Sequence, residues 1–99
     1  MTKIKRQVEH ILDELEGAKE YAECYVSEKA KGNTQWATRY KEMANDELKH
    51  AMYLHDKVTV EIEEISKVYT PPQEMMDKWE HDHKEYVEKS AWIKQMLAL

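Results

Sequence analysis

Residues 35–68 contain neither glycine nor proline, and this uninterrupted stretch constrains the fold strongly. Its apolar side chains recur every three or four positions, which is the period of one face of an α-helix. A helix of this length would extend about 50 Å, because each residue adds about 1.5 Å. The expected apolar stripe consists of Tyr40, Ala44, Leu48, Ala51, Leu54, Val58, Ile62 and Ile65.

Two further stretches, residues 3–31 and 71–97, have the same apolar period. The connection around Gly32 is short, so the second helix should return antiparallel to the first. The third helix is expected to fold back on the second and to cover the half that extends beyond the first. Residues 1–99 are therefore predicted to form a single all-α domain, an antiparallel three-helix chain with a long central helix.

The start of the third helix has a recognisable capping pattern. Thr70 would be the N-cap, Pro71 the first helical residue and Gln73 the third, which is a capping-box arrangement. The pattern predicts that the helix begins at Pro71.

Composition and charge exclude several classes of partner. The net charge is −5, and the basic residues are spread among acidic ones, so nucleic acid is not an expected partner. No apolar run approaches the roughly 20 residues of a membrane span, and no signal peptide is apparent. Cys24 is the single cysteine, which excludes an internal disulfide and fits a reducing compartment. We therefore expect a cytoplasmic protein.

Glu47 lies inside the apolar stripe of the second helix, and His50 lies at the border of that stripe. A carboxylate costs several kcal/mol to bury unless another group pairs with it. The Glu-x-x-His spacing places two metal-ligand side chains on one face of a helix. The pattern therefore predicts a metal site.

A glutamate of the first helix should complete this site. The position of the turn places Glu47 and His50 level with the middle of that helix, and the same geometry favours Glu16 as the partner. The more buried, aromatic side of the helix favours Glu14 instead. Glu20 is within one turn of the same level. The residues leave this choice open.

One chain would offer two carboxylates and one imidazole, which are too few to enclose two metal ions. A symmetric homodimer would offer twice as many ligands and would complete a four-helix bundle from two copies of the first two helices. Mixed carboxylate and imidazole ligands suit iron or manganese, and zinc can also use them.

His55 and His83 form a second candidate pair. The break near residue 70 places His83 within about one turn of His55, and both lie on apolar stripes. They could bind a metal together or extend the Glu47 site. The simpler interpretation is a pair of buried histidines, hydrogen-bonded to each other or to Tyr86 or Ser90.

A function of a different class also fits these residues. Glu47, His50, His55 and His83 could form a buried polar network that fixes the register of the helices. The chain would then be a metal-free structural or interaction module, in a phage-associated setting for example.

The motif Glu47-Leu48-Lys49-His50, with a glutamate on the preceding helix, resembles the ferritin-like superfamily. Asp13-Glu14-Leu15-Glu16, followed by Tyr21, is similar to the short encapsulated ferritins. That resemblance implies Glu14 as the ligand from the first helix, beside Glu47 and His50. It also implies a di-iron site that forms on dimerisation and oxidises Fe(II).

The resemblance covers about residues 8–60, and the long second helix and the third helix depart from the encapsulated ferritins. The chain is also similar to small uncharacterised bacterial and phage-associated helical proteins. The residues that carry this second likeness are Leu15-Glu16-x-Ala18-x-x-Tyr21-Ala22, Leu54-His55 and His83.

Overall fold

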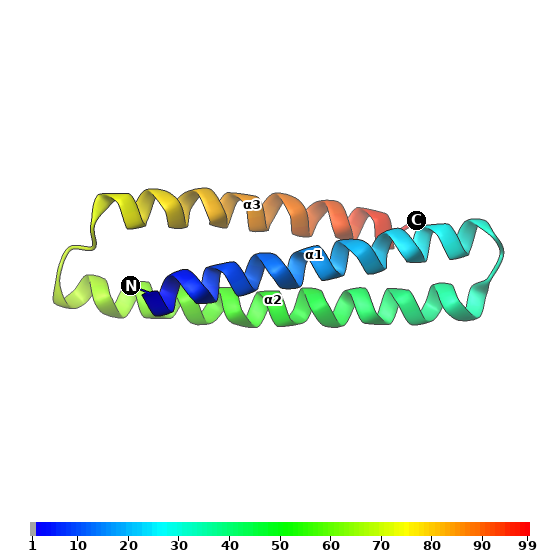
Figure 1. The fold of residues 1–99 in the computed structure, drawn as a ribbon, viewed down its shortest axis with the longest axis horizontal. Helices are drawn as coiled ribbons and strands as arrows, with labels where there is room; N and C mark the ends of the chain where they lie inside the picture. Colours follow the sequence, from blue (N-terminus) through cyan, green and yellow to red (C-terminus); the bar gives the residue numbers. More distant parts are fainter. Residues whose placement is uncertain (1) are drawn as a thin grey trace.

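The computed structural model describes residues 2–99, and this part of the chain forms three α-helices (Figure 1). The helices are α1 (Thr2–Ala30), α2 (Thr34–Val68) and α3 (Gln73–Leu97). The all-α, three-helix fold class is therefore confirmed. The molecule is elongated, with principal extents of 55 × 18 × 17 Å. Among the described residues, no helix has the length and apolar character needed to cross a membrane.

The turn between α1 and α2 forms as the glycine predicts. Gly32 adopts a φ of 77°, in the left-handed region that side chains disfavour. The backbone N–H of Asn33 donates to the carbonyl of Glu28 at 2.9 Å, and that of Gly32 donates to the carbonyl of Lys29 at 3.0 Å. This pair of hydrogen bonds is a Schellman motif. The motif ends α1 and reverses the chain, so that α2 runs back along α1.

The core lies mainly between α1 and α2. Alanines recur at the contact, which lets the two helices approach closely, and Leu15, Val58 and Ile93 are the largest fully buried side chains. The buried apolar residues are Ile4, Val8, Ile11, Leu15, Ala18, Ala22 and Tyr25 of α1, Ala37, Ala44, Leu48, Ala51, Val58 and Ile62 of α2, and Ile93 and Leu97 of α3. Most of the stripe predicted for the long helix therefore faces the core.

The start of α3 differs from the predicted one. The helix begins at Gln73, and Pro72 is its N-cap, with φ −55° and ψ 139° and without a side-chain cap. A residue that precedes a proline is disfavoured in the helical region, because the proline ring clashes with its backbone. Pro71 precedes Pro72, so Pro71 cannot open the helix. The capping-box prediction is wrong for this reason.

The placement of α3 also differs from the expected one. Its backbone follows α1 more closely than α2 (Figure 1). The Nζ atom of Lys89 on α3 is 3.9 Å from a carboxylate oxygen of Glu16, and the Nζ atom of Lys19 lies 5.5 Å from the ring centre of Trp92. These contacts identify one flank of α1 as the flank that α3 covers.

Candidate metal centre

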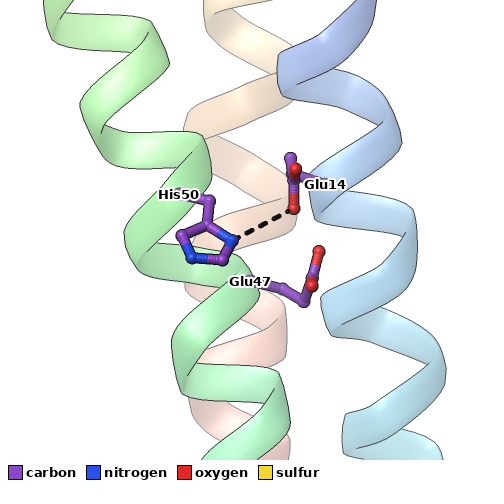
Figure 2. A group of neighbouring side chains, drawn as sticks. All are labelled: Glu14, Glu47 and His50. Atoms are coloured by element: carbon purple, nitrogen blue, oxygen red, sulfur yellow. Dashed lines mark ion pairs between the residues drawn. The ribbon is translucent and has the colours of Figure 1, made fainter.

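Glu14 of α1 and the pair Glu47 and His50 of α2 point toward one another across the hairpin (Figure 2). One ligand atom from each residue lies within 4.8 Å of the others. His50 Nδ1 lies 3.5 Å from Glu14 Oε2. We call these three residues the Glu14 cluster. Two carboxylates and one imidazole from two helices make it a candidate for a divalent cation.

The turn brings Glu47 to the expected level of α1. A Cβ atom placed on Gly17 would lie 3.2 Å from Oε2 of Glu47, so Glu47 lies opposite residue 17. Glu16 is at nearly the same height but on the other flank of α1, about 200° around the helix from Glu14. Its side chain is 51% exposed and pairs with Lys89. The structure therefore groups Glu14, and not Glu16 or the exposed Glu20, with the α2 ligands.

The pKa values of the two carboxyl groups in the cluster shift in opposite directions. A hydrogen bond to Glu14 raises the pKa of Glu47, and partial burial and the negative charge of Glu14 act in the same direction. The same hydrogen bond lowers the pKa of Glu14, against the opposing effect of burial, and nearby His50 and His10 lower it further. As the pH falls, Glu47 is therefore the carboxyl group of the pair that takes up a proton first, with Glu14 as its anionic partner.

His10 is a neighbour of the cluster that the sequence patterns do not single out. Its Nε2 atom lies 3.1 Å from Glu14 Oε1, while the other carboxylate oxygen faces His50. The side chain of His10 is 58% exposed, as its position off the apolar stripe predicts. Its spacing of four residues from Glu14 is the signal that could have identified the contact.

His55 and His83 meet elsewhere, between α2 and α3. His55 Nε2 lies 2.7 Å from His83 Nδ1, a hydrogen-bond distance. The His55 side chain is 14% exposed and stacks on Tyr86, with ring centres 4.3 Å apart. His83 is exposed, so the prediction that both histidines are buried is wrong for His83. His55 follows His50 by five residues, which turns it about 140° away around α2. The pair is therefore separate from the Glu14 cluster.

A second group of possible ligands lies on α3 and consists of His81, Asp82 and Glu85. Asp82 is only 5% exposed, and sequence patterns did not identify it as an inward residue. Its carboxylate accepts a hydrogen bond from Lys78 Nζ at 2.9 Å, and His81 Nδ1 is 3.3 Å away. The lysine ammonium already compensates the buried charge. This group is therefore a weaker candidate for a cation than the Glu14 cluster.

The Glu14 cluster lies on the flank of the α1–α2 hairpin that α3 leaves uncovered, with α3 behind it in Figure 2. Other residues of α2 continue this flank at alternating steps of four and three. Trp36 is 47% exposed and Met43 is 37% exposed, while Tyr40 and Leu54 are partly buried. Tyr40 stacks against Tyr21 of α1, with ring centres 6.3 Å apart. We call this surface the open face. It consists of His10, Glu14, Gly17 and Tyr21 of α1 and Trp36, Tyr40, Met43, Glu47, His50 and Leu54 of α2.

The function of these sites has to be inferred from their own chemistry. No protein-family model matches this chain, and no curated protein or solved structure is significantly similar to it.

Proposed function

We propose that the Glu14 cluster binds a divalent transition metal, with iron as the main candidate, in a ferritin-like dimer. The observation that carries this proposal is the convergence of Glu14, Glu47 and His50, with ligand atoms within 4.8 Å of one another. These groups come from two helices whose register is set by a tight turn and an apolar core. The cluster is therefore pre-positioned by the fold.

The ligand types select the class of metal. Carboxylate oxygen with imidazole nitrogen suits Fe(II) and Mn(II), and Zn(II) also accepts this set. Calcium and magnesium prefer oxygen ligands alone, so His50 argues against them. A bound cation would favour the ionised form of both carboxylates, and so would compete with the uptake of a proton that the raised pKa of Glu47 promotes.

A second copy of the chain would complete the site. Three ligands per chain leave coordination positions open, and the open face carries the large exposed side chains Trp36 and Met43 beside the cluster. Packing two open faces together would bury these side chains and bring two clusters close to a twofold axis. Four carboxylates and two imidazoles would then surround two metal ions.

With iron, the expected reaction is oxidation of Fe(II), which is the substrate. Two Fe(II) ions would give one electron each to O₂, which would take up two protons and leave as hydrogen peroxide. Open coordination positions would admit the oxidant. A reducing cytoplasm, which suits the free Cys24, would supply iron in the ferrous form.

The test is the iron content of untagged protein, purified without chelator and dialysed anaerobically against Fe(II). We expect about one iron per chain, as two ions in a dimeric site require. Glu47→Gln should lose this iron and keep its fold, because the amide can donate to Glu14 as the protonated carboxyl does. Glu16→Gln is the matched control and should retain the iron. Oxygen consumption on adding Fe(II) would then be measured.

The metal-free module is the outcome if the wild-type chain retains no metal. Two contacts favour this second candidate, because in both a polar side chain has a structural role: the hydrogen bond between His55 and His83, and the ion pair of the buried Asp82 with the exposed Lys78. Equal iron content in Glu47→Gln and wild type would also reject the Glu14 cluster as the site.

A further inference from the structure

Gly17 lies in the middle of α1, where glycine destabilises a helix relative to alanine. The helix runs through this position without a break, so no turn requires the glycine. Its φ is not positive, in contrast to Gly32, so backbone conformation does not require it either. The feature that distinguishes this position is the space beside it.

The space beside Gly17 holds the carboxyl group of Glu47. An added Cβ would lie 3.2 Å from Oε2, 3.6 Å from Cδ and 3.8 Å from Cγ of that side chain. The first of these distances is shorter than ordinary van der Waals contact, which begins near 3.4 Å. The three nearest atoms all belong to Glu47. A methyl group at residue 17 would therefore press on this carboxyl group, which would have to move by a few tenths of an ångström.

Displacement of Glu47 would act on the site directly. Glu14 precedes Gly17 by three residues, so the two positions are neighbours on the open face of α1. Glu47 reaches across from α2 and ends over this part of α1, next to Glu14 (Figure 2). A carboxyl group shifted in this way would meet Glu14 and His50 at changed distances, and this changes the geometry that the three residues offer a cation.

We propose that Gly17 is a positioning residue of the Glu14 cluster, and this role rests on the proposed metal-binding function. Because residue 17 has no side chain, the Glu47 carboxyl group can lie against α1. There its ligand atom is within 4.8 Å of those of Glu14 and His50. The glycine lowers the stability of α1 and in return allows the two carboxylates to bind one cation.

The test is Gly17→Ala, with Co²⁺ as the probe because its visible absorption reports the ligands and geometry of the bound ion. We expect Co²⁺ affinity to fall about tenfold, which is the lower end of the loss seen when a group that orients a metal ligand is removed. The absorption spectrum at saturation should also change. Ser27→Ala, on an exposed position of the same helix, is the matched control and should bind Co²⁺ as the wild type does.

Thermal unfolding without metal tests the same contact independently of binding. In a Glu47→Ala background, where no carboxyl group occupies the space, Gly17→Ala should raise the Tm by about 3–8 °C. In the wild-type background the increase should be smaller, because the new methyl group meets Glu47. A variant that fails to bind metal because it is unfolded would be recognised in this measurement.

Two results would overturn the role of Gly17, and they differ in what else they reject. If wild type binds Co²⁺ and Gly17→Ala binds it equally well, with the same Tm increase in both backgrounds, the positioning role alone is rejected. If the wild-type chain itself binds no Co²⁺, the proposed function is rejected, and the role of Gly17 with it.

Discussion

At the scale of single residues, the choice between Glu14 and Glu16 shows what a sequence can predict about this site. The length of the turn predicts the height of Glu47 along α1, and the structure places Glu47 opposite Gly17. Height alone favours Glu16. The flank is decided by α3, whose Lys89 pairs with Glu16, and by the hairpin packing that brings Glu14 to the open face. The aromatic side of the first helix favours Glu14, in agreement with the structure, but the element that packs on each flank is a tertiary property that the apolar period alone does not predict.

The opposite pKa shifts of Glu14 and Glu47 lead to a prediction about pH. The pKa of Glu47 is raised by its hydrogen bond to Glu14, and that of Glu14 is lowered by the same bond. A cation competes with protons for these carboxylates, so its affinity should fall as the pH decreases toward the raised pKa of Glu47. We expect Co²⁺ affinity to fall at least about tenfold between pH 7.5 and pH 5.

The measurement is a Co²⁺ titration at a series of pH values, with free cation buffered by a weak chelator. Without metal, pH should act on the stability of the fold in the opposite direction to its action on Co²⁺ affinity. The contribution of Glu47 to the free energy of unfolding is present at acid pH and decreases as the pH rises through its raised pKa. A Co²⁺ affinity that does not change with pH would show that the two carboxyl groups are not the ligands.

At the scale of helices, the apolar period of the sequence predicts the buried residues of α1 and α2 well and those of α3 less well. The alanine-rich stripes of α1 and α2 form the core, with Ala18, Ala44 and Ala51 fully buried. Asp82 of α3 is buried through its pairing with Lys78, an interaction that a hydrophobic pattern does not report. The bulky side chain of Trp79 packs against His55, across the wider separation between α3 and α2.

The contact between α2 and α3 should depend on pH. Burial lowers the pKa of His55, and the neighbouring His83 lowers it further, while Asp56 opposes both effects. Because its pKa is lowered, neutral His55 stabilises the fold fully above about pH 6.5, the ordinary pKa of histidine. This stabilisation is lost as the pH falls below that value. Acidification should therefore loosen α3 from α2.

His55→Phe tests this contribution, because a phenyl ring can keep the stacking on Tyr86 and Trp79 but cannot take up a proton. We expect the decrease in Tm between pH 7.5 and pH 5 to be smaller in this variant than in wild type. His81→Gln is the control, since its side chain is 79% exposed, and it should keep the wild-type decrease. Equal decreases in His55→Phe and wild type would contradict the role of the His55–His83 pair.

At the scale of the whole molecule, an elongated three-helix chain has one covered flank and one open face. The core supports the fold strongly, since truncation of a fully buried leucine such as Leu15 costs about 2–5 kcal/mol. The open face combines exposed Trp36 and Met43 with the Glu14 cluster. A second copy on this face would explain both the apolar side chains and the incomplete ligand set. Dimerisation and metal binding are therefore expected to depend on each other.

The most direct test of the metal centre is the location of the ion itself. Crystals of protein loaded with Mn²⁺ or Fe²⁺ would be measured at the absorption edge of the metal, and an anomalous difference map would be calculated. We predict a peak among Glu14, Glu47 and His50, with a second peak from another copy close by across a twofold axis. Anomalous peaks only at His81, Asp82 and Glu85, or none at the Glu14 cluster in metal-loaded crystals, would contradict the proposed site.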